Sequence, residues 1–388
     1  MLECVEGGAG PASLGGDAWD GEGERWVAEP RKYAPGLDSL LSWAYRIGAS
    51  RIAFQTAHPV WIRVHGRNYV ATRDSLDEAE IALIVNHLYG ADGMARLQGG
   101  GDFDVTYEIA VRRTERLRFR LNATPTRTSR REGANIVLRP IPGMPPSLEA
   151  QLVEVGILDA FRPREGMVIV SGATGSGKST LIAGMTVAKL QSNWSYNIVE
   201  GAAPIEFLLD RVRSGASTIN QTEIPRDLPS FEAFIRGCMR REPTDIIVGE
   251  CRDSVTMAAA IQAAISGHAL TTTIHANDVP LTMQRIASLC PPDERDNLIS
   301  AVAQSLRLVI NQRLTSSSDG KRVPLREYLA FDRSLRTQFL ETDPSQWPSL
   351  TRKAVEEQGQ SYKVAIENAL RAGRITKETA AYELREIG

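Results

Sequence analysis

The stretch SGATGSGKST holds the residues of this chain whose types and spacing point most directly to chemistry. Gly172 and Gly177 are separated by four residues, and Lys178 and Ser179 follow at once, which is the spacing GxxxxGK[S/T]. An apolar run from Met167 precedes the stretch, and a helical pattern follows it. Glycines let backbone N–H groups approach phosphate oxygens without a Cβ clash, a lysine neutralises the β- and γ-phosphates, and a serine hydroxyl holds Mg²⁺. We therefore predict a P-loop that binds ATP and Mg²⁺, formed by Gly172, Ala173, Thr174, Gly175, Ser176, Gly177, Lys178, Ser179 and Thr180.

A second candidate is the acid that ends the apolar run TDIIVGE. Glu250 would stand at the carboxyl end of a strand near the P-loop strand, because parallel strands end at one edge of their sheet. There it could orient the water that attacks ATP, or bind Mg²⁺ through a water molecule. Strands often end in an acid that has no catalytic role, so it is the P-loop that favours the functional interpretation of Glu250.

Two histidines are candidates for sensing the terminal phosphate. His268 follows a helix that we expect to end at Gly267, and His275 ends the run TTTIH. We expect both rings at the sheet edge that carries the P-loop, where they could hydrogen-bond the γ-phosphate. A lone histidine is more often structural, and this alternative stays open for both residues.

Arginines are concentrated in one stretch before the proline-rich segment. In the run RLRFRLN, Arg118, Arg120 and Asn122 alternate with apolar residues, so they should share one face of a strand. Three interpretations stay open: a solvated strand face, arginine fingers that reach a neighbouring subunit's ATP, and a groove for nucleic-acid phosphates. The arginines of the stretch are Arg112, Arg113, Arg116, Arg118, Arg120, Arg127, Arg130 and Arg131.

The elements that must position these residues follow two patterns. In the second part of the chain, apolar runs alternate with helical stretches, which predicts a mostly parallel sheet covered on both faces and hence an α/β fold. In the first part, helical spacing followed by period-two alternation predicts a small α+β domain. The stretch RPIPGMPPS is the best linker candidate because it holds four prolines. We expect a mobile acidic tail over 1–32, the α+β domain over 33–138, the linker over 139–147, an ATP-binding domain over 148–345 and a helical C-terminal segment over 346–388.

Composition limits the class of protein. The 388 residues carry a net charge of −2, with 42% hydrophobic and 24% charged residues, which is typical of a globular chain with more than one domain. Affinity for nucleic acid would therefore need a local basic patch. The four cysteines show no CxxC spacing, which argues against a zinc site and a disulfide framework. No apolar run reaches the roughly 18 residues of a membrane span, so we expect a cytoplasmic protein without a transmembrane segment.

Nine runs, in order along the chain, together make the sequence resemble a known family: GASRIAF, IRVHG, RFRLN, GATGSGKST, APIEF, QTEIPRDLPSF, IIVGECRD, SGHALTTTIHAND and LREYLAFD. It is similar to the type II/type IV secretion ATPase superfamily, which includes the PilT pilus-retraction motors. Within it, the wording of GECRD and LREYLAFD resembles the DotB/TraJ branch of type IVB secretion and IncI-type conjugation.

The resemblance implies an architecture and a set of roles. It implies a PAS-like N-terminal domain joined by a mobile linker to a RecA-like P-loop domain, with the subunits assembled as a hexameric ring. The implied roles are Lys178 and Ser179 in the Walker A motif, Glu250 as the Walker B glutamate, Glu206 in the aspartate box, His268 and His275 in the histidine box, and Arg118, Arg120 or Arg131 as trans-acting arginines. The family's aspartate box usually has an acid two residues before its proline, where this chain has Ala202, so Glu200 and Glu206 remain alternatives for that role.

These observations lead to one main hypothesis and several competitors. The main hypothesis is a homohexameric motor that couples ATP hydrolysis to a type IVB secretion or conjugative transfer machine and meets its inner-membrane components peripherally. The alternative is a nucleic-acid-translocating RecA-like ATPase, which the aromatic content of 6% disfavours because single-strand channels use stacking platforms. The intact P-loop with Glu250 disfavours a non-hydrolysing scaffold, and the chain has no NKxD motif of a small GTPase.

Overall fold

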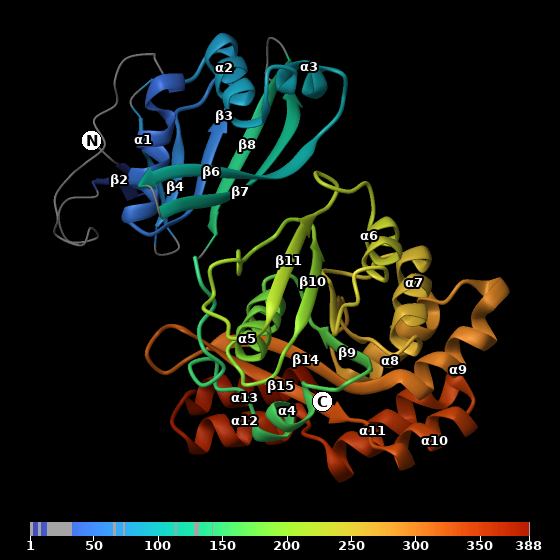
Figure 1. Cartoon of the computed structure of the whole chain (residues 1–388). Coiled ribbons are helices and arrows are strands. Elements are labelled where there is room, and N and C mark those ends of the chain that lie inside the picture. Colours follow the sequence, from blue (N-terminus) through green and yellow to red (C-terminus); the bar gives the residue numbers. More distant parts are fainter. Residues whose placement is uncertain are drawn as a thin grey trace. The chain divides into compact units, whose positions relative to one another are not determined.

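The computed structural model of the chain is shown in Figure 1. The chain divides into two compact units, Met1–Gly143 and Met144–Gly388, and the division falls inside the proline-rich stretch. Each unit has a hydrophobic core of its own. The structure describes residues 3–6, 9–13, 33–64, 67–72, 74–112, 115–127, 132–141 and 143–387.

The first unit is an antiparallel sheet with helices packed on it. The strand order is β2-β1-β5-β4-β3-β8-β7-β6, and every described pairing is antiparallel. Its core is formed by the apolar faces of the strands and by α1 and α2, as the helical spacing of Leu37, Leu40 and Leu41 predicts. The elements are β1 (Glu3–Glu6), β2 (Ala9–Ser13), α1 (Tyr33–Arg46), β3 (Ala49–Gln55), β4 (Trp61–Val64), β5 (Arg67–Val70), α2 (Glu78–Tyr89), α3 (Gly93–Gln98), β6 (Phe103–Arg112), β7 (Glu115–Arg127) and β8 (Glu132–Ile141).

Two strands lie in the segment expected to be a mobile tail. Strands β1 and β2 pair with each other, and β1 also pairs with β5 through Glu3↔Val70 and Cys4↔Tyr69. The expectation of a tail without structure is therefore wrong for these residues. Backbone hydrogen bonds do not depend on the type of side chain, so the absence of an apolar pattern did not exclude pairing of these two short strands. Residues 1–2, 7–8 and 14–32 lie outside the described part of the chain.

Strand β8 runs into the segment expected to be linker. Its residues Arg139–Ile141 pair with β7, whereas its pairing with β3 ends at Leu138. From there on β8 has only one neighbour in the ladder, which is where a proline such as Pro140 is tolerated because its missing N–H is not needed. The start of the expected linker is thus corrected from residue 139 to a position after Ile141.

The second unit contains the mostly parallel sheet that the sequence predicts. The order is β11-β10-β12-β13-β9-β14-β15, with all neighbours parallel except β14 and β15. The apolar runs of the sequence, MVIVSG, YNIVEG, TDIIVGE, ALTTTIH and LRLVINQRL, became β9, β10, β12, β13 and β14. The polar edge strand β11 and the antiparallel β15 were not predicted. The strands are β9 (Gly166–Ser171), β10 (Asn197–Ala202), β11 (Thr218–Glu223), β12 (Asp245–Val248), β13 (Ala269–Ile274), β14 (Leu306–Ser316) and β15 (Arg322–Ala330).

Helices cover both faces of this sheet (Figure 1). One core joins Met167 and Ile169 of β9 to helices α6 to α9, and the opposite core joins Val168 and Val170 to α5. This alternation is the period of two of a strand that is buried on both sides. The helices are α4 (Val155–Ala160), α5 (Lys178–Leu190), α6 (Phe231–Cys238), α7 (Ser254–Ile265), α8 (Val279–Leu289), η2 (Pro292–Glu294), α9 (Arg295–Ser305), α10 (Arg333–Glu341), η3 (Pro344–Gln346), α11 (Trp347–Gln358), α12 (Tyr362–Arg371) and α13 (Lys377–Ile387).

The C-terminal helices belong to the core of the second unit. Trp347 at the start of α11 is 1% exposed and lies in the same apolar cluster as the central strand β9. Its ring centroid is 5.5 Å from that of Phe339, which in turn lies 5.3 Å from that of Phe331. The indole N–H donates to the carbonyl oxygens of Phe339 and Thr342 at 3.1 and 3.2 Å. These three rings pack in tilted and edge-to-face contacts, and the aromatic cluster thus fixes α10 and α11 to the sheet.

We expect Trp347→Ala to lower the free energy of unfolding of the second unit by about 3 to 5 kcal/mol, because it leaves a large cavity and two carbonyls without their donor. Urea unfolding followed by far-UV circular dichroism measures the change. The matched control is Trp194→Ala, since Trp194 is 63% exposed and its truncation should cost no more than about 0.5 kcal/mol. Equal losses in the two variants would contradict the role of the aromatic cluster.

Candidate active site

The P-loop connects the carboxyl end of β9 to the start of α5. Gly172, Gly175 and Gly177 have φ of 141°, 79° and 85°, in the region that favours glycine. A Cβ on Gly172 would lie 2.2 Å from the carbonyl oxygen of Gln312, and one on Gly177 would lie 2.8 Å from the Nε2 of the same residue. The spacing of glycines that predicts the loop is therefore required by backbone conformation and by the close approach of β14.

Lys178 points its ammonium group back into the loop. Nζ donates to the carbonyl oxygens of Gly172 and Ala173 at 2.8 and 3.0 Å, and the residue is only 9% exposed. Burial lowers the pKa of this ammonium below its ordinary value, while the negative charges of Glu250 and Glu206 act in the opposite direction. The loop therefore presents a buried cation with two carboxylates near it, at the place where a nucleotide's phosphates would need it.

Glu250 and His275 meet at the carboxyl ends of neighbouring strands. The Nε2 of His275 lies 3.0 Å from the Oε1 of Glu250, and its Nδ1 lies 3.2 Å from the carbonyl oxygen of Gly172. The Nδ1 is within hydrogen-bond distance of that carbonyl oxygen, whereas the Nε2 approaches the carboxylate as an ion pair without hydrogen-bond geometry. The prediction that His275 stands beside the P-loop is met in the geometry, and the histidine joins the strand-end acid to the first residue of the loop.

Arg252 is a residue of this site that the sequence did not single out. Its Nε lies 2.7 Å from the Oε1 of Glu250, and its side chain is 70% exposed whereas that of Glu250 is 16% exposed. The pair thus puts an exposed guanidinium beside a partly buried carboxylate. The signal was available, because Arg252 follows Glu250 by two residues in the run GECRD.

The two acids of the aspartate box lie in different surroundings. Glu200 on β10 accepts a hydrogen bond of 2.6 Å from the Nε2 of Gln221, which also donates to the carbonyl oxygen of Phe207 at 2.8 Å. Burial raises the pKa of the Glu200 carboxyl to about 7, the Gln221 amide counteracts this, and the charge of Glu206 adds to it. Glu206 is the one of the two whose charge acts on Lys178. Glu206 thus lies within electrostatic range of Lys178, whereas Glu200 is hydrogen-bonded to Gln221.

His268 does not lie at the P-loop edge, contrary to our expectation. It precedes β13, and its carbonyl oxygen accepts from the N–H of Gly166 at the start of β9. His275 follows the same strand, so the length of a six-residue strand, about 20 Å, separates the two. A residue between a helix and a parallel strand belongs to the amino edge of the sheet, and that is why the expectation was wrong.

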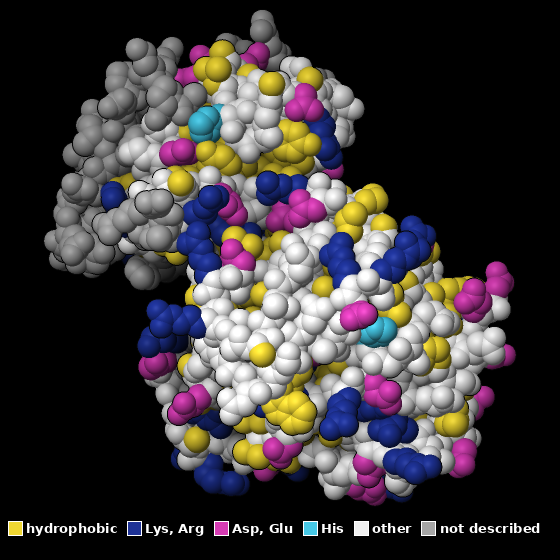
Figure 2. Space-filling model, viewed as in Figure 1, with side chains coloured by type: hydrophobic (Ala, Val, Ile, Leu, Met, Phe, Trp, Pro, Cys, Tyr) yellow, Lys and Arg dark blue, Asp and Glu magenta, His cyan; other side chains and the backbone are white. Residues whose placement is uncertain are grey.

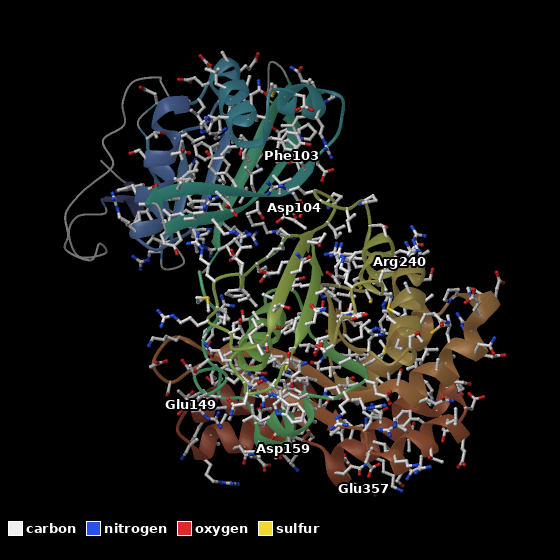
Figure 3. The ribbon with its side chains drawn as sticks, viewed as in Figure 1. Phe103, Asp104, Glu149, Asp159, Arg240 and Glu357 are labelled. Atoms are coloured by element: carbon white, nitrogen blue, oxygen red, sulfur yellow. The ribbon has the colours of Figure 1, made fainter. Side chains whose placement is uncertain are left out.

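The candidate arginines lie in the first unit and have acidic neighbours on β6. The Nε of Arg118 lies 3.0 Å from Glu108, and the Nη2 of Arg120 lies 2.6 Å from Asp104, which Figure 3 labels. The side chain of Arg118 is 8% exposed and that of Arg120 is 39% exposed. Arg131 lies outside the described part of the chain. The predicted alternation is confirmed, since Leu117, Phe119 and Leu121 are all buried on the other face of β7.

Asn311 of β14 supports the site from behind and was not predicted. Its Nδ2 donates to the hydroxyl of Ser171 at 2.7 Å and to the carbonyl oxygen of Ala276 at 2.9 Å, and its Oδ1 accepts from the hydroxyl of Tyr362. The amide thus ties the end of β9 to the turn after His275. The only sequence signal was a pair of polar residues inside the apolar run LRLVINQRL.

A nucleotide with a magnesium ion fits this donor set. The buried hydroxyl of Ser176 has no hydrogen-bond partner among the described residues, as expected of a loop shaped for a polar ligand. Within the described part of the chain no group of three or more His, Cys, Asp or Glu side chains could hold a metal ion. A magnesium ion here would depend on phosphate oxygens together with the hydroxyl of Ser179, with Glu250 acting through water.

Comparison with known proteins assigns the chain to a family. The family described as "Type II/IV secretion system protein" matches residues 39–379. The chain belongs to this secretion ATPase family. This ATPase is 28% identical to the type IV pilus retraction ATPase PilT of Pseudomonas aeruginosa, over 89% of this chain and 96% of that protein. The related proteins PilT, PilB and DotB are named ATPases. This chain is accordingly a P-loop ATPase.

Solved structures give the same fold for this ATPase. The crystal structure of the Legionella pneumophila ATPase DotB matches with a TM-score of 0.81 and 35% identity, over 93% of this chain and 98% of that one. The pilus retraction motor PilT with bound ADP matches with a TM-score of 0.74 and 27% identity, over 89% of this chain and 96% of that one. The predicted RecA-like P-loop fold is thereby confirmed. None of the helices in the described part of the ATPase is long and apolar enough to span a membrane.

The raised pKa of Glu200 makes the stability of this ATPase depend on pH. In the unfolded chain the carboxyl titrates near its ordinary pKa of 4.5, and in the folded chain near about 7. The folded state binds the proton more tightly than the unfolded state. The contribution of this carboxyl to the free energy of unfolding is therefore fully present below the pKa of the unfolded state and is lost as the pH rises through the pKa of the folded state. We expect the wild type to lose about 1 to 3 kcal/mol more than Glu200→Gln between pH 5 and pH 8.

Urea unfolding of the nucleotide-free chain at the two pH values measures this difference. Glu232→Gln is the matched control, because Glu232 lies on the surface with a side chain 44% exposed and should keep the wild-type slope. Parallel pH profiles for the wild type and Glu200→Gln would show that the carboxyl is ionised in the folded state throughout this range.

Proposed function

We propose that this ATPase is the motor of a type IVB secretion or conjugative transfer machine, and that it works as a homohexamer on ATP with Mg²⁺. The likeness to DotB, at 35% identity over 93% of the chain, supports a machine of the type IVB class. The likeness to PilT supports a pilus motor as the nearest competing assignment. We expect it in the cytoplasm, associated peripherally with inner-membrane components of the machine.

The observation that carries the proposed chemistry is the contact of Lys178, Gly172, His275 and Glu250 at one sheet edge. Lys178 would bind the β- and γ-phosphates, and Ser179 would bind the magnesium ion. Glu250 would orient the attacking water, with its carboxylate held by His275 and Arg252. Glu206 would then take the aspartate-box role, because its charge acts on Lys178.

The nucleic-acid translocase remains the alternative that the experiments must separate. Arg118 and Arg120 are paired with Glu108 and Asp104, which reduces the positive charge available for a nucleic-acid groove. On the face of the second unit shown in Figure 2, Lys and Arg side chains lie among Asp and Glu side chains. Stimulation of ATP hydrolysis by single-stranded DNA would favour the translocase over the secretion motor.

Two substitutions should fail in different ways. Lys178→Ala should abolish both nucleotide binding and hydrolysis, because it removes the cation that holds the phosphates. Glu250→Gln should bind a fluorescent ATP analogue almost as well as the wild type but hydrolyse ATP about 10² to 10⁴ times more slowly, because only the base that activates water is neutralised. Phosphate release and fluorescence titration measure the two properties separately.

Glu232→Gln controls for the loss of a surface carboxylate and should leave both properties unchanged. Thermal unfolding of each variant would show that the fold is retained. Hydrolysis by Glu250→Gln at the wild-type rate would move the catalytic role to Glu206 or Glu200. Tight binding of the analogue by Lys178→Ala would reject the site assignment altogether.

Trans-acting arginines give the hexamer a test of its own. If Arg120 reaches a neighbour's γ-phosphate, Arg120→Ala should lose about 10³ to 10⁵ in rate. Rings mixed from Arg120→Ala and Lys178→Ala subunits should recover part of the activity, because some interfaces pair an intact P-loop with an intact arginine. A surface pocket of 380 Å³ beside Ala173 and His275 leaves room for such a residue. Arg118→Ala and Arg131→Ala are tested in the same way.

Arg96→Ala, an exposed arginine of the same unit, should hydrolyse ATP at the wild-type rate. Recovery is interpreted only in mixtures whose subunits co-purify through two different tags. If such mixed rings stay as inactive as the separate variants, the arginines do not act across the subunit interface.

A further inference from the structure

The side-chain amide of Gln312 lies between the P-loop and a buried arginine. Its Nε2 donates to the carbonyl oxygen of Ser176 at 2.6 Å, and its Oε1 accepts from the Nε of Arg326 at 2.6 Å. Gln312 is 3% exposed and Arg326 is 1% exposed. No water can therefore replace either partner without a rearrangement of the core.

The orientation of this amide is fixed by its two partners. The carbonyl oxygen of Ser176 can only accept, and the guanidinium of Arg326 can only donate. Among side chains of this size only a glutamine satisfies both at once. A glutamate would still accept from Arg326 but would place an oxygen against the carbonyl of Ser176, and a methionine would satisfy neither group.

Arg326 carries the connection to the segment that follows the division between the two units. Its Nη2 donates to the carbonyl oxygen of Gln151 at 2.9 Å, and its Nη1 donates to that of Leu152 at 3.1 Å and to the Oε2 of Glu154 at 3.0 Å. Burial lowers the pKa of this guanidinium, and the charge of Glu154 opposes the shift. Removal of the Glu154 carboxylate would therefore leave a buried positive charge without its counter-charge.

A second contact joins the same segment to the helix that begins in the P-loop. The Nε2 of Gln151 donates to the carbonyl oxygen of Pro146 at 2.7 Å and to that of Thr180 at 3.2 Å. The segment also has a turn structure of its own, in which the N–H groups of Leu152 and Val153 donate to the carbonyls of Glu149 and Leu148. Residues 146–154 are thus hydrogen-bonded to the P-loop region by two separate routes.

We propose that Gln312 is a positioning residue that couples the segment 146–154 to the P-loop, so that nucleotide binding and the state of this segment are linked. The proposal rests on the proposed role of the P-loop as the nucleotide site. Residues 146–154 lie just after the boundary at Gly143, and the relay Glu154, Arg326, Gln312, Ser176 connects them to the predicted phosphate-binding loop. The coupling is reciprocal, since each end biases the other by the same free energy.

The test uses ADP and the full-length chain. In the wild type, saturating ADP should slow amide hydrogen exchange in peptides that cover residues 147–154. In Gln312→Glu the affinity for ADP should fall about 3- to 10-fold, the worth of one hydrogen bond, and the slowing in residues 147–154 should be lost. Gln338→Glu, an exposed glutamine on α10, is the matched control and should behave as the wild type.

A double-mutant cycle approaches the relay from its other end. Glu154→Gln should weaken ADP binding in the wild-type background but have no further effect in Gln312→Met, because the connection is already broken. Additive effects of the two substitutions, or unchanged ADP affinity and exchange in Gln312→Glu, would overturn the coupling. Loss of ADP binding in Lys178→Ala, measured beside them, shows that such a failure concerns the coupling and leaves the nucleotide site in place.

Discussion

The register of the parallel ladder is the constraint on which the site depends. Ser171 at the end of β9 pairs with Ile274 of β13 on one side and with Asn311 of β14 on the other. Because these three residues form one row across the sheet, the residues that follow them emerge together. Gly172 and His275 follow the first two, and Gln312 follows the third. A shift of one of these strands by a single residue would move the side chains of that strand to the opposite face of the sheet.

The positive and negative side chains of the site lie close together and are partly shielded from solvent. Lys178 is the buried cation of the loop, and the carboxylates of Glu250 and Glu206 offset the cost of its burial. Glu250 in turn lies within 3.0 Å of nitrogens of His275 and Arg252. Electrostatic interactions are stronger in such surroundings than in water, so a small displacement of one group changes the field at all the others.

How much of the site could be predicted from the sequence depends on how far apart the interacting residues lie along the chain. The P-loop was predictable because all its residues are adjacent in the chain, and Glu250 because a strand end can be recognised locally. His268 was misplaced because the histidines were assigned to an edge without asking which end of β13 each occupies. Gln312 was missed because its partner Ser176 is 136 residues away. No local pattern records such a contact.

The same contrast holds for the fold. Strands β9, β12 and β13 are buried on both sides and show as apolar runs. Strand β11 reads TINQTE and lies at the sheet edge, so its polar sequence gives no apolar run by which a strand could be predicted.

The packing of Trp347 also has a consequence for the order in which the chain assembles during synthesis. The core around β9 is complete only with α11, and the Oδ1 of Asn311 receives its donor only from Tyr362. We therefore expect the nucleotide site to assemble after the ribosome has passed these residues.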